Sequence, residues 1–560
     1  MMQEAWLPPE LWLHIFRQLA VADLSSARLV CTAWWRLLDS APHLWIGVRV
    51  NKRKLQLSGR LPAALLAGPQ LRHAVLDLSR AWLGPAQWTA LLTQLTLCPP
   101  IHSLSVAEAD MAEVEPALLT AALSNARTVV AASLHNLDWD PVFRGLAASP
   151  TLQSIDLSEN FLPLVPVPLF VATLARLQQV ELNDSLVTGE QLRGLVEAVA
   201  TSGTRLAANI VCENIHHTPL HLVTAFSRLY KTYFYLEDYS EVTEQAWSSV
   251  LRASRSAGSI LEELSIDGLA VRMEGVEPEL LASSLSSLSC LKLSGVQLTP
   301  SQWTALLNRL RPGQTKQMTE LTLRMVNLTC VPVSVLAPAL AARPRLALEF
   351  AALSDDQWVA LLVECAAAKP ALLRIVQCGL PAELPASLLA GAVAACQAVD
   401  LSASALQPRH TEAVLEGIPG SRTTDATLQG LDLSGVPGAT LARAATHLTR
   451  LNLRKTRLDT PQVTALLAAN LANRSRLRCL DLSGVNLSPV PADLLALSVS
   501  RLREADLCLT WLTRDQVAGL ATQITRYTRL EHLRLQSASV SLLSPDMKRN
   551  IDKNMKLVVY

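Results

Sequence analysis

The sequence predicts an α/β protein in which short strand–helix repeats stack side by side as a solenoid, preceded by a small helical module. Three observations predict this architecture. An L-x-x-L-x-L pattern recurs from residue 76 to residue 533 at a mean spacing of about 27 residues, as expected of an internal repeat. Each recurrence precedes an apolar segment of helical length, and these segments open in two alternating ways. Hydrophobic residues make up 50% of the 560 residues and charged residues 17%, which is enough apolar surface for a continuous core.

The first module, residues 7–45, has the pattern of three short helices. Apolar residues at 11, 15, 16 and 19 form one stripe of an amphipathic helix. Asp23 suits the N-cap of a second helix, and residues 30–38 suit a third. About forty residues cannot bury this much apolar surface alone. We therefore expect a partner, or the rest of the chain, to cover the module.

The same module closely resembles the F-box. The matching pieces are LPxE at residues 7–10, Ile-Phe-x-x-Leu at 15–19, Asp-Leu at 23–24, Arg-Leu-Val-Cys-x-x-Trp at 28–34 and Leu-Trp at 44–45. The resemblance implies a three-helix F-box over residues 6–46 that docks onto the Skp-type adaptor of a cullin-RING ubiquitin ligase. The adaptor-binding residues that it implies are Leu7, Pro8, Glu10, Leu11, Ile15, Phe16, Leu19, Leu24, Val30, Cys31, Trp34 and Trp45. The alternative is a helical cap that seals one end of the repeats.

The middle apolar residue of each L-x-x-L-x-L pattern places one repeat. The predicted middle residues are Leu76, Leu104, Leu134, Ile155, Val180, Ala208, Phe234, Leu264, Leu291, Leu321, Leu348, Ile375, Val399, Leu431, Leu451, Leu480, Ala505 and Leu533. The repeats at 134 and 208 are degenerate. One type of repeat opens its helix with a capping box, such as Thr299 with Gln302. The other opens with proline and a Leu pair, as at residues 491–495. The full repeat is therefore a pair of about 54 residues.

Alternating strand–helix repeats of this length resemble the ribonuclease-inhibitor class of leucine-rich repeats. The resemblance implies a leucine-rich-repeat solenoid shaped as a horseshoe, with a parallel sheet inside and helices outside. We expect a linker and leading cap at residues 47–70, about 18 repeats over 71–543, and a C-terminal cap or tail at 544–560. The position five residues after the middle apolar residue of each repeat is often Val, whereas the family usually has Asn or Cys there. Asn160 is an exception, so a continuous asparagine ladder is not expected.

The residue that follows each middle residue should face the concave side of the sheet, because neighbouring strand residues point to opposite faces. Its acidic members are Asp77, Asp156, Glu181, Glu349, Asp400, Asp432, Asp481 and Asp506, against only Lys292 and Arg534. A second column of side chains on the same face contains the acids Glu237 and Asp267 and the bases Arg324 and Arg454. We predict an acidic docking face for a basic segment of a substrate protein; the alternative is that these acids serve only strand formation and solubility. The predicted contact residues are Asp156, Glu181, Tyr235, Asp267, Asp400, Asp432, Asp481 and Asp506.

Aromatic residues fall into two groups. Trp88, Trp247, Trp303 and Trp358 occupy corresponding helix positions, which favours core packing over a role as binding hot spots. Five further aromatics lie between residues 230 and 239. They form either a contact patch, with Tyr235 facing the concavity, or a repaired packing defect.

Other features narrow the class of function. Lys plus Arg (49) nearly equals Asp plus Glu (48), so we expect neither a general nucleic-acid binder nor a membrane-surface binder. Ten cysteines without a CxxC pair and an N-terminus without a signal-peptide pattern predict an intracellular protein of the cytoplasm or nucleus. Common phosphate-loop, hydrolase and zinc-protease motifs do not occur. We expect no catalytic residue, cofactor or metal, although His216, His217 and His221 form a dense group.

These observations predict the non-catalytic substrate-recognition subunit of an SCF-type ubiquitin ligase. Residues 6–46 would hold the adaptor, and the concave face would hold a substrate protein. The alternative is a ligase-independent repeat scaffold or inhibitor that binds a protein in the same concavity.

Overall fold

The structure is a computed structural model, and it describes most of residues 75–542. Within that range it leaves out 80–82, 99, 112, 135–136, 183–184, 203, 212–228, 237–243, 256–260, 314–317, 473–474, 527–529 and 531. Elsewhere it describes Trp12, Ile15, Phe16, Trp34 and residues 556–559. The predicted linker and leading cap, residues 47–70, therefore lie outside the described residues. The chain divides into an N-terminal unit, residues 1–235 with 252–261, and a C-terminal unit, residues 236–251 with 262–560.

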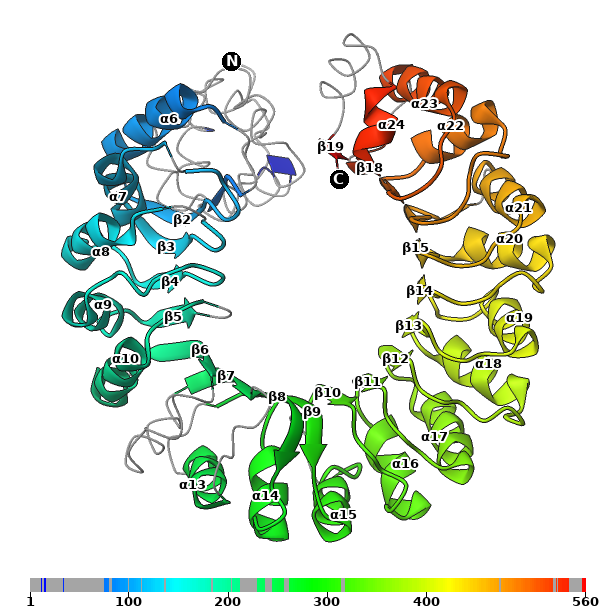
Figure 1. Ribbon diagram of the computed structural model, residues 1–560, viewed down its shortest axis with the longest axis horizontal. Coiled ribbons are helices and arrows are strands. Elements are labelled where there is room, and N and C mark those ends of the chain that lie inside the picture. Colours follow the sequence, from blue (N-terminus) through cyan, green and yellow to red (C-terminus); the bar gives the residue numbers. More distant parts are fainter. Residues whose placement is uncertain are drawn as a thin grey trace, which may run out of the picture. The chain divides into compact units, whose positions relative to one another are not determined.

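The N-terminal unit contains strands that pair in parallel, and a helix lies in each connection from β1 to β6 (Figure 1). Its strands are β1 (Val75–Asp77), β2 (Ile101–Ser105), β3 (Ala126–Val130), β4 (Ser154–Asp156), β5 (Gln179–Leu182), β6 (Arg205–Val211) and β7 (Leu229–Leu236). Its described helices are α6 (Pro85–Leu97), α7 (Pro116–Ser124), α8 (Trp139–Ala148), α9 (Val167–Leu174) and α10 (Gly189–Ser202). Helix α13 (Glu244–Ser254) spans the boundary between the units.

The C-terminal unit continues the same alternation. Its strands are β8 (Glu263–Arg272), β9 (Cys290–Gln297), β10 (Glu320–Arg324), β11 (Arg345–Glu349), β12 (Leu372–Val376), β13 (Ala398–Asp400), β14 (Asp425–Thr427), β15 (Arg450–Asn452), β16 (Cys479–Asp481), β17 (Glu504–Leu507), β18 (His532–Leu535) and β19 (Lys556–Val559). Its helices are α14 (Pro278–Leu285), α15 (Pro300–Arg309), α16 (Val333–Ala341), α17 (Asp355–Ala368), α18 (Ala386–Ala395), α19 (Pro408–Gly417), α20 (Gly438–His447), α21 (Thr460–Asn470), α22 (Ala492–Ser500), α23 (Arg514–Arg526) and α24 (Ser537–Ser541).

Within each unit the strands line the inner edge of the repeats and the helices line the outer edge (Figure 1). This arrangement confirms the predicted α/β class with a parallel sheet and helices on one side. Strand β19 pairs with β18, so the sheet extends into the segment predicted as a C-terminal cap or tail. The four tryptophans Trp88, Trp247, Trp303 and Trp358 are buried between sheet and helices, which confirms core packing.

The doubled period has a structural cause in a buried glutamine. The Gln357 side chain accepts a hydrogen bond from the Ser354 backbone N–H at 2.7 Å, which completes the capping box of α17. Its Nε2 group also donates to the Leu328 and Val331 carbonyl oxygens of the preceding repeat, at 2.9 and 2.7 Å. The repeat of α17 is thus joined to the loop of the repeat before it. The same bonds recur at Gln191, Gln302, Gln462 and Gln516.

Two members of this series have a different residue. In α13 the position before Trp247 holds Ala246, which has no side-chain amide. In α19 the glutamine position holds His410, which is buried. Its Nδ1 accepts from the Gln407 backbone N–H, and its Nε2 lies 2.8 Å from the Leu384 carbonyl oxygen. Because Nδ1 is the acceptor, Nε2 carries the proton and donates. The imidazole therefore replaces the amide in both of its structural roles.

Strand register corrects six of the predicted middle residues. Leu206 pairs with Leu229, so the repeat predicted at Phe234 centres five residues earlier. Leu104 pairs with Val129 and Val180 with Leu206, so the degenerate repeats centre on 129 and 206 instead of 134 and 208. Leu321 pairs with Leu346, and Leu346 with Leu373, which moves two more centres back by two residues. Val399 pairs with Ala426, five residues before the predicted Leu431. These strands were misplaced because apolar residues also recur at later positions of the same repeat. Leu134, Leu348 and Leu431, for example, are buried like the true middle residues.

Most strands end in a turn residue with a left-handed backbone, four residues after the middle. Glycine fills this place at Gly295, Gly430 and Gly484. Elsewhere non-glycine residues adopt it, with φ between 50° and 59°: Glu108, Ser133, Glu159, Met325, Phe350, Gln377, Ala403, Lys455 and Leu509. This conformation costs an L-residue roughly 1–2 kcal/mol. The turn is therefore imposed by the stacking of repeats, not by the local sequence.

Candidate protein-docking face

The parallel register arranges the side chains of the concave face in rows that cross the strands. The central row consists of the residues that follow each middle residue. In the C-terminal unit it runs Ser265, Lys292, Thr322, Ala347, Arg374, Asp400, Thr427, Asn452, Asp481, Asp506 and Arg534. Acids and bases are therefore balanced in this row. The prediction of an acidic column is wrong here, because the misplaced centres concealed Arg374 and put Glu349 in the wrong row.

In the N-terminal unit, the central row across β1–β5 has only acidic charges. Asp77, Asp156 and Glu181 are its charged members. Asp156 and Glu181 are neighbours in register and line a hollow of about 520 Å³ together with Thr128 and Gln179. A local acidic site remains on β4 and β5, where the sequence placed it.

The aspartates of the central row also have a structural role. Asp156 accepts a hydrogen bond from the backbone N–H of the residue two positions later, Ser158, at 2.9 Å. The same turn forms at Asp77, Asp400, Asp481 and Asp506. A carboxylate in this position shapes the turn after the strand. The recurring Asp-Leu-Ser sequence is thus explained in part by local folding, whatever else these acids bind.

Asp432 is not on the strand rows, contrary to the prediction. Strand β14 ends at Thr427, and Asp432 lies in the following turn, where it forms an isolated bridge with Arg457. Its carboxylate is 3.6 Å from the Arg457 guanidinium. Hydrogen bonds from Ser434, supported by Arg457, lower the pKa of Asp432. Asp267 does lie on the concave face, in register with Ser294 of β9.

Two aspartates near the C-terminal end of the sheet have opposite pKa shifts. Burial raises the pKa of Asp481, and the neighbouring Asp506 adds to the effect. Asp506 is itself desolvated, but hydrogen bonds from Cys508 and Ser483 outweigh the desolvation and lower its pKa. Ser483 Oγ donates to Asp506 at 2.7 Å, and Arg534 lies 3.3 Å away. The two carboxylates border a hollow of about 300 Å³ with Arg450 and Arg534.

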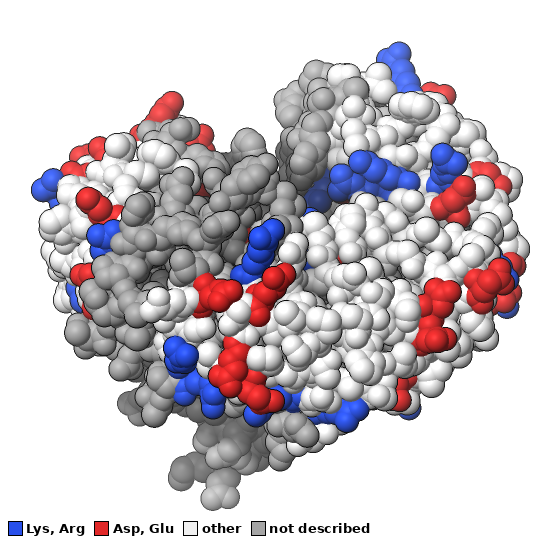
Figure 2. Space-filling view, turned by 60° about the horizontal axis from the view of Figure 1, so that its bottom comes forward, with Lys and Arg blue, Asp and Glu red and all other residues white. Residues whose placement is uncertain are grey.

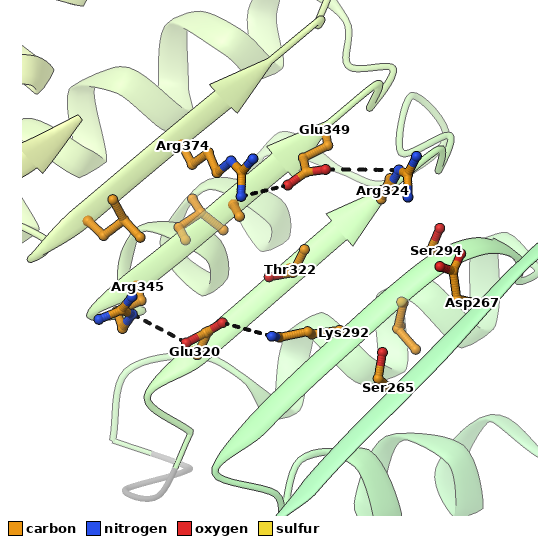
Figure 3. A pocket seen from close by; sticks show the side chains of 14 residues that line it. Ser265, Asp267, Lys292, Ser294, Glu320, Thr322, Arg324, Arg345, Glu349 and Arg374 are labelled. Carbon is orange, nitrogen blue, oxygen red and sulfur yellow. Dashed lines mark ion pairs between the residues drawn. The ribbon is translucent and has the colours of Figure 1, made fainter. Parts of the chain in front are cut away.

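Opposite charges alternate across β9–β13 in two ion-pair chains. In the first, Glu320 lies between Lys292 and Arg345, at 3.5 and 3.2 Å. In the second, Glu349 lies between Arg324 and Arg374, at 3.9 and 3.2 Å, and Arg374 also reaches Asp400 at 3.1 Å. Figure 3 shows the two chains on either side of Thr322. The hollow between them measures about 280 Å³.

Several predicted residues cannot be placed in full. Tyr235 belongs to β7, but its side chain lies outside the described part of the structure, as do Glu237 and the histidines 216, 217 and 221. Cys290 and Cys479 occupy one row beside the central row, as their sequence positions suggested, and both are half-buried. Among the described residues no group of three or more His, Cys, Asp and Glu side chains could hold a metal ion.

Only four residues of the predicted F-box are described. Trp12, Phe16 and Trp34 form an aromatic cluster, with ring centroids 4.5–5.8 Å apart. Phe16 is buried, whereas Ile15 is 41% exposed. The adaptor contacts implied for Leu7, Pro8, Glu10, Leu11, Leu19, Leu24, Val30, Cys31 and Trp45 fall outside the described residues. Of the predicted contacts, Ile15 is the described side chain that is exposed enough to meet a partner.

Charged side chains on the face drawn in Figure 2 lie in small groups of mixed sign, separated by wide uncharged areas. No broad area of one sign is present among the described residues of this view. No helix in the described part of the chain is long and apolar enough to cross a membrane.

A family model described as F-box-like matches residues 6–50. No curated protein matches the chain. Among solved structures, the chain is similar to the Rad7–Elc1 complex of yeast, at 14% identity over 66% of this chain and 88% of that chain, with a TM-score of 0.36.

Two further solved structures are similar at the same low identity. The leucine-rich repeat-containing protein LegL7 from Legionella pneumophila shares 13% identity over 50% of this chain and 90% of that chain, with a TM-score of 0.29. The Toll–Spatzle complex of Drosophila shares 15% identity over 84% of this chain and 59% of that chain, with a TM-score of 0.27. An F-box-like match at residues 6–50 therefore precedes the parallel strand–helix repeats of the described part of the chain.

Proposed function

We propose that this chain is the substrate-recognition subunit of an SCF-type cullin-RING ubiquitin ligase. In this role the F-box-like segment binds the Skp-type adaptor, and the concave face of the repeats binds a substrate protein. The observation that carries the proposal is the F-box-like match over residues 6–50, followed by strand–helix repeats with an open, charged sheet face. The chain itself performs no chemistry. It raises the effective concentration of a substrate lysine near the conjugating enzyme.

The acidic site on β4 and β5 supports the proposal that the bound substrate segment is basic. Asp156 and Glu181 lie side by side in register. In the segments that follow β4 and β5, Phe161 and Leu186 are paired in a bridge, and both are more than half exposed. A segment that combines basic and apolar side chains suits this surface, since opposite charge steers association and apolar contact gives affinity.

The adaptor step is tested with Ile15→Asp. The exposed isoleucine can be charged without opening the aromatic cluster, whereas Phe16→Ala would remove a buried ring and unfold the module. We expect the full chain to co-elute one-to-one with the Skp-type adaptor on size exclusion, and Ile15→Asp to abolish co-elution while the thermal midpoint stays within about 2 °C. Leu97→Asp is the matched control, because Leu97 is exposed on α6, outside the F-box-like segment.

Three outcomes separate the hypotheses. Co-elution that is lost in Ile15→Asp and kept in Leu97→Asp supports the receptor. A soluble full chain that never binds the adaptor favours the ligase-independent scaffold, with the N-terminal helices as a cap. Binding that survives Ile15→Asp would show that the F-box-like segment is not the adaptor-binding surface.

A further inference from the structure

We infer that β4, β5 and the segments that follow them bind a helical segment of the substrate, which has basic side chains on one face and apolar side chains on the next. This surface, the β4–β5 rim, consists of Asp156, Glu159, Phe161, Leu164, Glu181 and Leu186. The inference rests on the proposed function for its partner and deepens it, because it names the conformation of the bound segment and the side chains that hold it.

Three large apolar side chains of the rim face solvent. Phe161 is 56% exposed, Leu164 77% and Leu186 61%, while Leu162 and Val165 between them are buried. Phe161 and Leu186 are paired in an isolated bridge, so they lie side by side. Exposed apolar side chains scattered singly are normal, whereas a group of them marks an interaction surface.

The backbone that carries these side chains is held in place by buried hydrogen bonds. The Asn160 amide donates to the Ala131 and Leu157 carbonyl oxygens at 2.8 and 2.7 Å. From the next repeat, Gln191 donates to the Leu162 carbonyl oxygen at 3.0 Å. Two backbone hydrogen bonds of 2.9 Å join the segments after β4 and β5 to each other. The apolar groups are therefore displayed on a fixed backbone, which lowers the entropic cost of binding.

The charge beside these apolar groups is negative. The segments that follow β2 to β5 are residues 106–115, 131–138, 157–166 and 183–188, and they contain seven Asp and Glu residues but no Lys or Arg. On the strands themselves, Asp156 and Glu181 border a hollow of about 520 Å³, which has room for the long side chains of Lys or Arg. A base in the ligand would therefore meet acids both in the hollow and at the rim.

The nearest bases lie at the margins and do not cancel these acids. Arg127 and Arg205 are at the starts of β3 and β6, at the other end of the strands. Arg176 precedes β5 and donates to the Ser149 carbonyl oxygen, and the arginines of α8 and α10 are on helices at the outer edge (Figure 1). Lys231 is in β7, two strands or about 10 Å beyond β5. In all, residues 101–200 contain twelve Asp and Glu residues against four Arg and no Lys.

Two rows across β4 and β5 set the spacing that a ligand must match. Asp156 and Glu181 are in register in an acidic row, and Phe161 and Leu186 are in register in an apolar row. Each pair is thus about 4.8 Å apart, one strand spacing. Side chains four residues apart on a helix are separated by about 5–6 Å, whereas alternate residues of a strand are about 6.6 Å apart. A helix along the rows can therefore place two bases over the acids and two apolar residues over the apolar pair.

Binding is measured with the full chain and three fluorescent 16-residue peptides in an alanine background. The first has Arg and Leu on neighbouring faces at helical spacing, the second has Glu in place of Arg, and the third has the composition of the first in alternating, strand-like order. Fluorescence polarisation should show the first binding roughly tenfold tighter than the second, because opposite-charge contacts become like-charge contacts, and severalfold tighter than the third. Equal binding of the first peptide and either of the others would overturn the inference.

Charge variants locate the site. Asp156→Asn with Glu159→Gln removes two charges but keeps the side-chain oxygens that accept the turn hydrogen bonds. It should abolish the preference for the first peptide over the second. Glu274→Gln with Glu383→Gln is the control, because both residues are exposed in segments that follow β8 and β12. An equal loss of preference in the two double variants would show a general charge effect and refute the site.

Apolar variants test the other half of the rim. Phe161→Ser should weaken binding of the first peptide severalfold, while the thermal midpoint stays within about 2 °C because the ring is exposed. Trp511→Ser is the matched control: Trp511 is 72% exposed and, like Phe161, lies six residues after the middle of its strand. Unchanged binding in Phe161→Ser, or an equal loss in Trp511→Ser, would contradict the inference.

Other occupants of the rim give different results. Binding of the first peptide that appears only when Lys52, Arg53 and Lys54 are changed to Gln would show that the chain's own basic segment covers the rim. A dimer that Phe161→Ser dissociates on size exclusion would show that a second copy does. Either result overturns the inference.

The test also separates this inference from the proposed function. Adaptor co-elution without discrimination among the peptides leaves the receptor intact and refutes the rim alone. Discrimination among the peptides without adaptor binding retains the rim and refutes the ligase role.

Discussion

The buried glutamine that joins the repeats gives the sharpest prediction about stability. Gln357→Ala removes three hydrogen bonds at once: one accepted from Ser354 and two donated to the Leu328 and Val331 carbonyl oxygens. Leu328 O keeps the Val331 N–H at 2.9 Å as a partner. The Val331 carbonyl and the Ser354 N–H lose the partner that Gln357 supplied.

The magnitude follows from these losses. A buried group left without a partner costs roughly 1–3 kcal/mol, and loss of helix capping about 1 kcal/mol. We expect Gln357→Ala to lower the free energy of unfolding by about 3 kcal/mol. Gln357→His should lose less than half as much, because His410 makes the equivalent bonds elsewhere in this chain.

The assay is urea unfolding followed by tryptophan fluorescence, to which Trp358, fully buried next to the substitution, contributes. Hydrogen exchange of residues 326–332 would show that the loop of the preceding repeat opens first. Glu364→Ala, an exposed position of the same helix, is the control and should stay within about 0.5 kcal/mol. A loss below about 1 kcal/mol for Gln357→Ala, or an equal loss for Gln357→His, would refute the reasoning.

Three further predictions follow from local features. Burial raises the pKa of Cys365 and Cys396 to about 12, so maleimide should label the exposed Cys330 first in the native protein and these two only on unfolding, as read by peptide mass mapping. Leu509→Gly should stabilise the protein by about 1 kcal/mol, because Leu509 is exposed at a φ of 56°; a lower thermal midpoint would contradict the assigned strain. Burial raises the folded-state pKa of Asp481, so its contribution to stability is present below the unfolded pKa and lost as pH rises through the folded value. The thermal midpoint of Asp481→Asn, relative to that of the native chain, should therefore rise as the pH increases from 3 to 7. A difference that stays constant with pH would refute this.

Local sequence patterns predicted most helix starts because capping is a local interaction. Thr299 with Gln302 and Asp459 with Gln462 form the expected capping boxes. The distance from the middle residue of a strand to the next helix start also locates that middle residue, where the apolar pattern alone is ambiguous. Leu321 and Leu480 lie eleven residues before the proline N-caps Pro332 and Pro491. The same distance before Pro437 gives Ala426 as the middle of β14, as the structure shows.

The charge of the docking face was predicted less well. An error of two residues keeps a side chain on the same face of a strand but moves it to another row, as happened to Glu349. An error of five residues moves it into a turn, as happened to Asp432. The replacement of the joining glutamine by His410 was also missed, because no local rule equates an imidazole with an amide in a capping box.

By itself the sequence determined the α/β class, the paired repeat, the tryptophan core and the F-box resemblance. Each of these depends on residues close together in the chain or on a periodicity that survives errors of a few residues. Only the tertiary structure decided which charges meet across the sheet. Glu320 and Arg345 are 25 residues apart in the chain but 3.2 Å apart in space, because parallel strands bring into contact residues that lie one whole repeat apart, and the register that aligns them is set by the stacking of neighbouring repeats.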